Sequence, residues 1–599
     1  MPQSEPLPRV DAPLEARWNR ESVFETPASF DAEASAIARE LDARPFAAFT
    51  GRLGDPAALL KALRLQDDLS VRLERLFTYA SLEMAVDGRD QASTARGDRL
   101  GGLAARLSEG SAFIEPELLA LGEARVRELA ARPEFSDYAV SLATLLERAP
   151  HVRSAEVEAL LGAAQEPFSA GARIHGALAN ADAKFQDAVS GSGESSAVNH
   201  SLWQLESPDR ALRESAWRSY QAGHLATQNT AAACIQFGAK RDAFLARARG
   251  FNSSLEAALF NHQVPPAVYR NLLDTYQANL PLWHRYWAVR RDALGLELHA
   301  PWDDLAPLAA EPPALSFAQA AETVLRGVKP LGDDYVNRLR RGLLQERWVD
   351  WAPNAGKRLG AFSTGTHGTF PFIFMSFQGS LLDLSTLAHE SGHSMHTHLA
   401  NTNHAYRDAS YGLFVAETAS NFHQALVRHS LLEHATGAER VAVLLEAFNN
   451  FRRYFFIMPC LARFELEVHE RVERGEGLTA DDLNGLMLDL LKAGYGPAVQ
   501  VPDEAGIMWA EFSTHLYANF YVYQYATGIS AAHALAERVL NGGPEAAQAY
   551  LSSLKAGASL KPLEALRLAG VDMTSPAPVE AAFRVLSGYV DDLAALVKT

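Results

Sequence analysis

The sequence has little cysteine, an excess of acid over base, and no long apolar run. Only Cys234 and Cys460 are cysteines among 599 residues. Two cysteines exclude a disulfide framework and a zinc-finger set, and they are typical of a reducing compartment. The formal net charge of -17 disfavours nucleic acid as a partner, because an acidic chain repels a phosphate backbone.

Signals for export or for a membrane are missing from the sequence as well. No apolar stretch approaches the roughly 18 residues of a membrane span, and residues 455–462, among the longest, include Pro459. Residues 1–18 lack the basic-then-apolar pattern of a signal peptide. We therefore expect a cytoplasmic protein that does not act at a membrane.

Apolar residues recur with helical spacing along most of the chain and predict a mainly α protein. The predicted helices are 32–41, 67–84, 94–107, 154–162, 211–222, 227–246, 266–294, 317–325, 335–344, 413–434, 439–474, 480–493, 514–539 and 544–556. Breaks are predicted at 51–56, 87–88 and 115–116, where Gly and Pro punctuate the pattern.

Two stretches read as short strands instead. Residues 190–193, Ser-Gly-Ser-Gly, predict a turn between strands that pair as a hairpin, and they mark a boundary between an N-terminal helical lobe (1–200) and the rest (201–599). Residues 360–377 are rich in Gly, Thr, Phe and Ser and predict two strands around a Gly-rich turn. Beside a metal site, such an edge strand can bind an extended peptide; a small buried hairpin is the alternative.

Residues 387–396, LAHESGHSMH, contain an HExxH motif. In a helix, His389 and His393 lie one turn apart on one face, where two imidazoles can bind one metal ion. Glu390 then lies where a carboxylate can reach water on the metal without binding the metal itself. Two histidines on an ordinary surface helix are the alternative interpretation.

The same segment carries a start signal and a glycine. Ser380 or Asp383 can cap the helix, after the turn signal at 378–380. Gly392 disfavours the helix by about 1 kcal/mol relative to Ala. A glycine at this position indicates that another backbone, or the substrate, passes close by.

A catalytic zinc site usually has three protein ligands and one open position. The metzincin extension of HExxH is absent, because His396 stands where it needs Gly and Leu399 where it needs His. His398 and His404 are not obvious ligands either. Glu417 is the natural candidate, since its apolar, small-residue context makes an unpaired carboxylate costly; an ordinary carboxylate on a helix surface is the alternative.

Four blocks of sequence occur in this order along the chain: AGKRLGAFS (355–363), LAHESGHSMH (387–396), FVAETAS (414–420) and FYVYQYATG (520–528). Together they resemble the oligoendopeptidase F branch of the thimet oligopeptidase family of zinc metallopeptidases. The resemblance covers most of the chain, and APHVRSAEVEALL (149–161) resembles the helical oligopeptidase F domain.

The resemblance implies a mainly α, two-lobed zincin-type peptidase with a deep central channel and a small β-sheet beside the HExxH helix. It implies an oligopeptidase F-type domain at about 115–190 within residues 1–200, and a catalytic zinc metallopeptidase domain at 201–599. His389, His393 and Glu417 would bind one Zn²⁺ per chain, with Glu390 as general base toward a zinc-activated water.

The expected activity is hydrolysis of internal peptide bonds of short oligopeptides. The resemblance implies this substrate class, because folded chains cannot enter the channel. The sequence leaves the oligomeric state open, with a monomer among the alternatives.

The resemblance also implies that a His and a Tyr from residues 515–525, HLYANFYVYQY, stabilise the transition state. As a helix, this segment would place Tyr517, Tyr521 and Tyr525 on one face. We assign the roles to His515 and Tyr521, and then to Tyr525. An aromatic core helix that simply buries its rings is the alternative.

Two positions depart from the family pattern. Gln424 stands seven residues after Glu417, where relatives often have an acid, and Phe370 precedes Pro371, where relatives often have His. His367 lies nearby and could substitute for that histidine.

Two rival functions remain. A di-iron carboxylate bundle needs two Glu-x-x-His pairs on separate helices, and only the pair formed by Glu390 and His393 is present. A non-enzymatic helical scaffold would not need Glu390 and Glu417, which are both intact.

Overall fold

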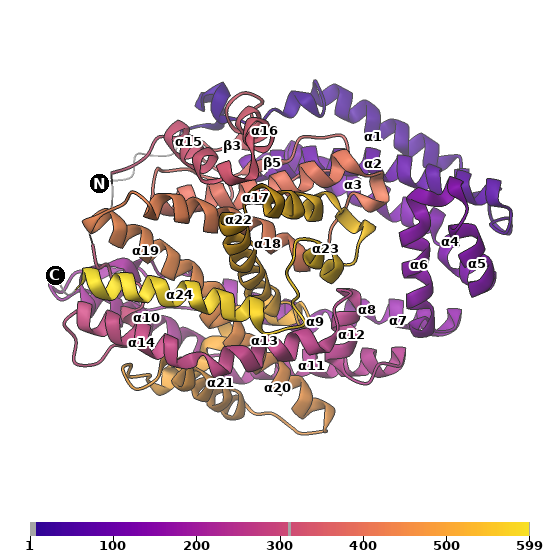
Figure 1. Ribbon diagram of the computed structural model, residues 1–599. Coiled ribbons are helices and arrows are strands. Elements are labelled where there is room, and N and C mark those ends of the chain that lie inside the picture. Colours follow the sequence, from indigo (N-terminus) through magenta and orange to yellow (C-terminus); the bar gives the residue numbers. More distant parts are fainter. Residues whose placement is uncertain (1–6, 310–312, 598–599) are drawn as a thin grey trace. The chain divides into compact units, whose positions relative to one another are not determined.

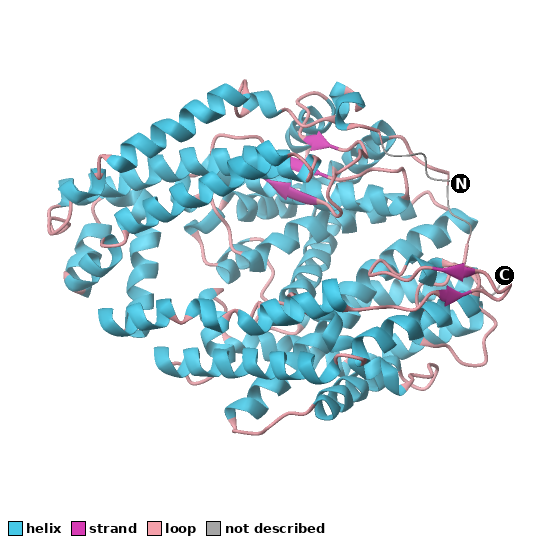
Figure 2. Cartoon of the chain, turned by 180° about the vertical axis from the view of Figure 1, so that it is seen from behind, coloured by secondary structure: helices cyan, strands magenta, loops and turns pink. Residues whose placement is uncertain are grey.

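The computed structural model describes residues 7–309 and 313–597, and most of this part of the chain is helical (Figures 1 and 2). The predicted mainly α class is therefore confirmed. Two compact units form, each from separate stretches of sequence: unit 1 is Met1–Pro150, Pro313–Ser430 and Leu535–Gly570, and unit 2 is His151–Pro312, Leu431–Ala534 and Val571–Thr599. The sequence division near residue 200 and the deep channel stay predictions.

Unit 1 contains an N-terminal run of helices and a second run that begins at Phe317. The first run is α1 (Pro27–Asp42), α2 (Pro56–Val86), α3 (Gln91–Ser111), α4 (Ile114–Ala120), α5 (Glu123–Ala130) and α6 (Ala139–Arg148). The second run is α15 (Phe317–Gly327), α16 (Asp333–Leu344), α17 (Leu381–Asn403), α18 (Leu413–Leu432) and, near the end of the chain, α23 (Pro562–Leu568).

Unit 2 is also built from helices. They are α7 (Ala155–Ala163), α8 (Gln165–Phe168), α9 (Ala170–Ala177), α10 (Arg210–Leu225), α11 (Gln228–Arg249), α12 (Ser254–Asn261), α13 (Pro266–Ala278), α14 (Leu280–Ala293), α19 (Gly437–Arg452), α20 (Met458–Glu473), α21 (Ala480–Tyr495) and α24 (Ala577–Leu596). The long α22 (Tyr523–Lys555) begins in unit 2, has a non-helical residue at Gly543, and ends in unit 1.

The strands are short and confirm both predicted strand regions. In unit 1, β5 (Phe372–Phe374) pairs in parallel with β3 (Val349–Asp350) and antiparallel with β4 (Phe362–Thr364). The order β3-β5-β4 leaves β4 at an edge. In unit 2, β1 (Ala188–Val189) and β2 (Ser195–Ser196) form the predicted hairpin. α17 packs against β4 and β5, so the small sheet does lie beside the HExxH helix.

Core residues from the N-terminal part of unit 1 pack against this sheet. Trp18 packs edge-on against Tyr79 of α2 and Phe372 of β5, with ring centroids 5.7 and 5.0 Å apart. Phe372 and Phe374 belong to the same buried cluster as residues of α1, α2 and α3. Aromatic rings bury large apolar areas, so this cluster holds β5, and β4 beside it, in a fixed position.

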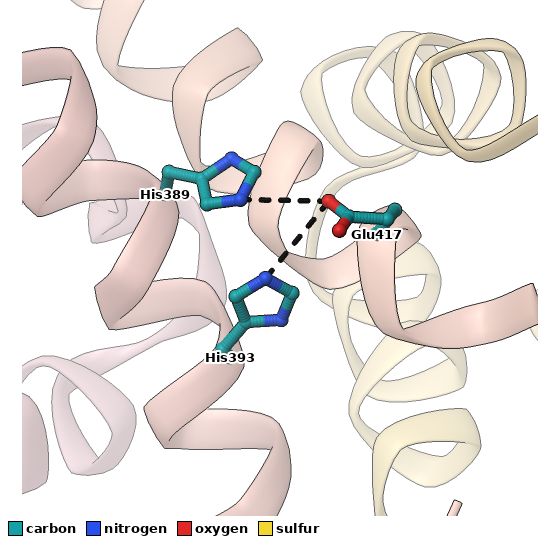
Figure 3. Close-up of side chains that lie close together, drawn as sticks. All are labelled: His389, His393 and Glu417. Atoms are coloured by element: carbon teal, nitrogen blue, oxygen red, sulfur yellow. Dashed lines mark ion pairs between the residues drawn. The ribbon is translucent and has the colours of Figure 1, made fainter. Parts of the chain in front are cut away.

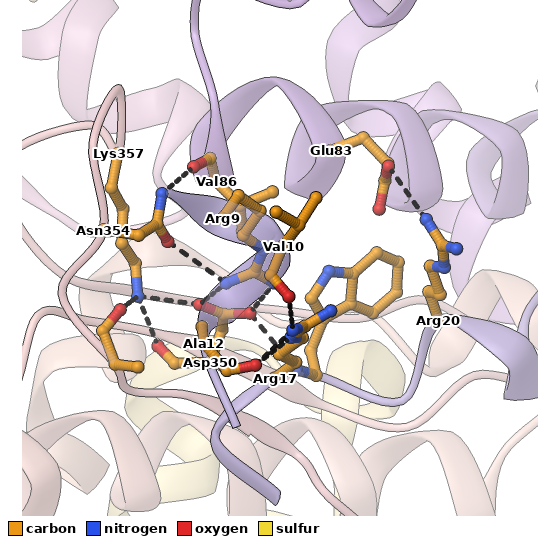
Figure 4. A network of polar contacts seen from close by, with 12 residues as sticks. Arg9, Val10, Ala12, Arg17, Arg20, Glu83, Val86, Asp350, Asn354 and Lys357 are labelled. Atoms are coloured by element: carbon orange, nitrogen blue, oxygen red, sulfur yellow. Dashed lines mark hydrogen bonds and ion pairs between the residues drawn. The ribbon is translucent and has the colours of Figure 1, made fainter. Parts of the chain in front are cut away.

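A buried carboxylate ties the N-terminal segment to β3 (Figure 4). Asp350 is fully buried and accepts hydrogen bonds from Arg9, from the Lys357 ammonium at 2.7 Å and from the Trp18 backbone N–H at 3.2 Å. A buried charge is tolerated when it is paired and hydrogen-bonded. Asp350 therefore fixes Trp18 and the start of the sheet to each other.

Three sequence predictions of helix boundaries were wrong. The break at 115–116 lies inside α4, because Pro116 falls in the first turn, where no N–H is needed. The single helix predicted at 266–294 is two, α13 and α14, because Pro281 begins a new helix. The helix predicted at 439–474 is confirmed as α19 and α20, which are joined without a break by a π turn (Arg453–Ile457) just before Pro459.

The third wrong boundary concerns residues 514–539. Residues His515–Tyr517 form a 3-10 turn, and Asn519 and Phe520 have left-handed backbone, with φ of 46° and 55°. α22 therefore begins only at Tyr523. No Gly or Pro marks this break in the sequence.

Helix α17 starts as its sequence predicts. Ser380 accepts a hydrogen bond from the Asp383 N–H at 3.1 Å, and the Asp383 carboxylate accepts from the Ser380 N–H at 3.0 Å. This reciprocal capping box satisfies two N–H groups of the first turn. It fixes the helix start two turns before His389.

At Gly392 the backbones of α17 and α18 approach each other closely. A Cβ atom at Gly392 would lie 2.4 Å from the Ala419 carbonyl oxygen and 2.7 Å from Ser420 Cα. Real Cβ atoms do not come so close to backbone, so only glycine fits here. The predicted close passage of another backbone is confirmed, and the backbone is that of α18.

Among the described residues, no helix has the length and apolarity needed to cross a bilayer.

Replacing Gly392 with Ala should lower the stability of the protein. The new methyl group forces α17 and α18 apart, and overpacking of this kind costs about 1–3 kcal/mol, more than the roughly 1 kcal/mol that Ala gains over Gly in a helix. Thermal and urea unfolding of both proteins measure the difference.

Gly102→Ala is the matched control. Gly102 lies on α3 in the same unit and is exposed, and a Cβ atom added to it would have no other atom within 4 Å. This substitution should leave stability unchanged or raise it. A Gly392→Ala protein as stable as its parent would contradict the close approach.

Candidate metal centre

Helix α17 presents two imidazoles on one face. His389 and His393 have ring centroids 4.8 Å apart, and both rings point toward α18 (Figure 3). Their side chains are 13% and 17% exposed, so each ring is largely covered yet reachable. The HExxH segment is helical, as its pattern predicts.

Helix α18 brings Glu417 to the two imidazoles. Glu417 Oε2 lies 3.4 Å from His389 Nε2 and 3.9 Å from His393 Nε2 (Figure 3). The Ser420 hydroxyl donates to the same oxygen at 3.0 Å, which fixes the direction of the carboxylate. Within the described stretches of the chain, these three residues are the one group of His, Cys, Asp or Glu found with the spacing of a metal site.

The three donor atoms fit a single metal ion. They lie within 4.8 Å of one another. An ion about 2.0–2.2 Å from each donor in tetrahedral geometry separates two donors by about 3.3–3.6 Å, close to the distances to Glu417. Two His nitrogens and one carboxylate oxygen form a donor set of catalytic zinc sites.

Gln424 fixes the orientation of His389. Its Oε1 lies 3.0 Å from His389 Nδ1, and its Nε2 donates to Ser385 Oγ at 2.8 Å. Because the amide nitrogen is the donor to Ser385, the amide oxygen accepts from the imidazole, and the proton sits on Nδ1. His389 Nε2, which faces Glu417, is then left with a free lone pair.

His393 is held in a form that can bind a metal. Burial lowers its pKa to about 4, and the neighbouring His389 adds to the decrease. The ring is therefore neutral at physiological pH, and a neutral imidazole nitrogen is the form that binds a metal.

Glu390 lies buried on α17, next to the small sheet. Only 6% of the residue is exposed, and the backbone N–H of Ser363 on β4 is near enough to its carboxylate to oppose the rise of its pKa. The Oε2 atom has no hydrogen-bond partner among the described residues. Burial raises the pKa of Glu390 to about 7, with Glu417 adding to the increase and His389 opposing it.

The β4 strand is attached to α17 through side chains as well. Ser363 Oγ and Ser394 Oγ form a hydrogen bond of 2.8 Å. This contact sets the edge strand directly against the HExxH turn. Phe370 is partly buried and packs against the unit 1 core, with its ring centroid 6.1 Å from that of Phe372.

The other histidines of this region have different partners. His396 stacks on Tyr411 with ring centroids 3.6 Å apart. Arg338 Nε donates to His398 Nε2 at 3.1 Å, and His404 Nε2 lies 2.6 Å from the Lys555 carbonyl oxygen. None of the three belongs to the metal-like group of described residues.

The three other predicted site residues gather in unit 2. The hydroxyls of Tyr521 and Tyr525 are 2.8 Å apart, and the His515 ring lies 6.1 and 6.0 Å from their rings. Burial lowers the pKa of His515, with Arg453 adding to the decrease. Tyr517 does not share this face, because its hydroxyl lies 3.2 Å from His175 Nδ1.

Sequence reasoning missed the supporting residues of this centre. The partner of His389 is Gln424, which the sequence showed only as a departure from a family pattern, and Ser385, Ser420 and Ser363 carried no signal. The seven-residue spacing from Glu417 to Gln424 is about two helical turns. That spacing could have placed both side chains on the α18 face that meets α17.

Comparison with known proteins agrees with this geometry. The model of Peptidase family M3 matches residues 203–585, and that of Oligopeptidase F matches residues 117–185. The chain is 34% identical to Oligopeptidase PepF of Bacillus subtilis over 595 residues, covering 98% of this chain and 88% of that protein. It is 33% identical to Group B oligopeptidase PepB of Streptococcus agalactiae over 586 residues, covering 97% of each.

A solved structure agrees as well. The crystal structure of oligoendopeptidase-F from Enterococcus faecium matches with a TM-score of 0.74 at 30% sequence identity, covering 95% of this chain and 99% of that one. The chain therefore belongs to peptidase family M3, in its oligoendopeptidase F branch, and is a metalloendopeptidase.

Proposed function

We propose that this protein hydrolyses internal bonds of short peptides at a single zinc ion held by His389, His393 and Glu417, with Glu390 as general base. The observation that supports the proposal most directly is the convergence of both imidazoles on the Glu417 carboxylate. Zinc, when bound there, supplies Lewis acidity that acidifies water and polarises a carbonyl group.

Glu390 is suited to move protons in this reaction. A group whose pKa lies near the operating pH can both accept and release a proton efficiently, and burial raises the pKa of Glu390 to about 7. The Ser363 N–H of β4 lies near its carboxylate. Glu390 takes a proton from the attacking water and delivers it to the leaving amine nitrogen.

The β4 strand would bind the substrate backbone. It is an edge strand of the β3-β5-β4 sheet, and its Ser363 touches both Glu390 and Ser394. An extended peptide that adds to this edge gains backbone hydrogen bonds regardless of its side chains. The names of the relatives, oligopeptidases and oligoendopeptidases, support short peptides as the substrate class.

His515, Tyr521 and Tyr525 are proposed to donate hydrogen bonds to the oxyanion of the transition state. The family resemblance supports this role, and so does the grouping of these three side chains in unit 2. Such donors act best when they are held in place before the reaction.

Glu390→Gln should abolish peptidase activity and leave the metal in place. The amide cannot accept a proton, and loss of general base catalysis costs about 10²–10⁴ in kcat. Cleavage of a quenched short peptide and zinc content per chain are measured together.

Glu83→Gln is the control, because Glu83 is another carboxyl of unit 1 whose pKa burial raises and it lies on α2. It should keep the parental rate. Cleavage by the Glu390→Gln protein at the parental rate would disprove the assigned base.

Removal of the metal should abolish activity reversibly. Dialysis against a chelator should stop cleavage, and one equivalent of zinc should restore it, because three ligands leave one open position for chemistry. Elemental analysis should give one zinc per chain; two iron atoms per chain would instead support the di-iron rival.

Glu417→Ala should lower the zinc content far below that of the parent. Glu322→Ala is its control, since Glu322 makes an exposed ion pair with Arg340 that should matter little. A Glu417→Ala protein with full zinc occupancy would refute the third ligand.

Gln424 substitutions should change zinc affinity in opposite directions. Gln424→Leu removes the acceptor that orients His389, and loss of such a partner typically weakens metal binding about 10–100-fold. Gln424→Glu offers a carboxylate to the same Nδ1–H, makes the imidazole a stronger donor and should tighten binding. Competition with a chromogenic chelator measures both. Equal affinities for all three proteins would show that Gln424 does not act on the metal ligand.

A further inference from the structure

A strained turn precedes helix α22 in unit 2. Asn519 and Phe520 are consecutive residues with left-handed backbone, at φ of 46° and 55°. Asn tolerates this conformation, but a bulky residue such as Phe rarely adopts it, because its Cβ crowds the backbone. Such residues persist only where the surroundings hold them, and they gather at functional sites.

The carboxyl group of Glu465, on α20, holds this turn. The Phe520 backbone N–H donates to Glu465 Oε1 at 2.6 Å. Glu465 is 2% exposed and Phe520 is fully buried. A buried N–H needs an acceptor, and among the described residues Glu465 Oε1 is the acceptor of the Phe520 N–H.

The ring of Phe520 is fixed from two sides. Its centroid lies 5.5 Å from that of Tyr269 and 4.6 Å from that of His469. His469 is itself fixed through both ring nitrogens, at 2.8 Å from the Glu465 carbonyl oxygen and 3.2 Å from Asp242 Oδ2. The turn therefore rests on a rigid support made by α20 and α11.

The turn determines where the next side chain points. Tyr521 follows Phe520 directly, and its hydroxyl lies 2.8 Å from that of Tyr525 in the first turn of α22. With an ordinary helical turn at 519–520, the Tyr521 side chain would leave the backbone in another direction, because left-handed and right-handed conformations direct Cβ differently.

We propose that Glu465 is a positioning residue of the active site: its carboxyl oxygen locks the left-handed turn at Asn519 and Phe520 and so aims the Tyr521 hydroxyl. The inference rests on the role proposed above for Tyr521. Glu465 itself touches no substrate and acts only through the backbone of the turn.

Two substitutions of Glu465 separate the hydrogen bond from the bulk of the side chain. Glu465→Gln keeps an acceptor oxygen at the same place and should keep kcat within about 2-fold of the parent, since the geometry is retained. Glu465→Met keeps the length without an acceptor and should lower kcat by about 10²-fold, the effect of misplacing a reacting group by about 1 Å. KM and zinc content should not change.

Glu473 supplies the matched control on the same helix. Its carboxylate also accepts a hydrogen bond from a backbone N–H, that of Ser254, at 2.6 Å. Ser254 begins α12, so this bond does not involve the turn at Asn519 and Phe520. Glu473→Met should leave kcat unchanged. An equal loss in the Glu473→Met protein would indicate a general structural effect and overturn the proposal.

A double-substitution cycle with Tyr521→Phe tests the direction of the effect. Tyr521→Phe alone should lower kcat by about 10²–10³-fold, as loss of one oxyanion donor does. Glu465→Met should then add little further loss, because both changes remove the same hydroxyl from its place. Full additivity of the two losses would overturn the proposal.

A readout independent of turnover uses 3-fluorotyrosine at position 521. In zinc-free protein, its ¹⁹F resonance should shift or broaden in Glu465→Met and not in Glu465→Gln. If the resonance moves while Tyr521→Phe leaves kcat intact, the positioning by Glu465 stands and the proposed role of Tyr521 fails.

An unchanged resonance and unchanged kcat in a folded Glu465→Met protein would overturn the positioning. Should Glu465→Met fail to fold, Glu465→Asp replaces it. The shorter acid keeps the carboxyl group but withdraws its oxygen from the Phe520 N–H, so the same loss of kcat is expected. Parental kcat in that variant would overturn the proposal.

Discussion

The candidate metal centre depends on the close approach of two helix backbones at Gly392. Any side chain there would meet the Ala419 carbonyl and Ser420 Cα. With the backbones this close, a short acidic side chain on α18 reaches imidazoles on α17, and the Glu417 carboxylate lies 3.4 Å from the nearer ring nitrogen. Helix packing usually leaves 8–10 Å between axes, depending on the side chains at the contact, and the absence of a Cβ at Gly392 lets the two backbones approach each other there.

Around this approach, buried polar groups set the chemical state of each participant. Gln424 holds the proton of His389 on Nδ1, burial keeps His393 neutral, and Ser420 directs the Glu417 oxygen. Glu390 keeps a buried carboxyl oxygen, Oε2, without a partner among the described residues. Hydrogen-bonded neighbours therefore orient the residues that would bind a metal, and the Glu390 oxygen lies beside them without such a bond.

In unit 2, the aromatic residues are held in position in a different way. There the backbone itself is strained at Asn519 and Phe520, and a buried carboxyl and two aromatic rings hold the strain in place. The sequence pattern predicts a helix that continues through this segment, but packing against α20 and α11 interrupts that helix. Strain supported in this way keeps a side chain in one direction without a metal or a disulfide.

The sequence by itself determined the helical class, the cap at Ser380, the HExxH turn and the candidacy of Glu417, because each depends on local spacing and on the cost of an unpaired charge. Only the tertiary structure decided that α18 passes over Gly392, that Gln424 reaches His389, and that the helix predicted through 514–539 breaks at Asn519. The effect of each proline depended on its position in the helix. Pro116, Pro281 and Pro459 all lie in the first turn of a helix, where a proline is tolerated. Contacts between residues distant in sequence fix these features, and the spacing of residue types along the chain does not reveal such contacts.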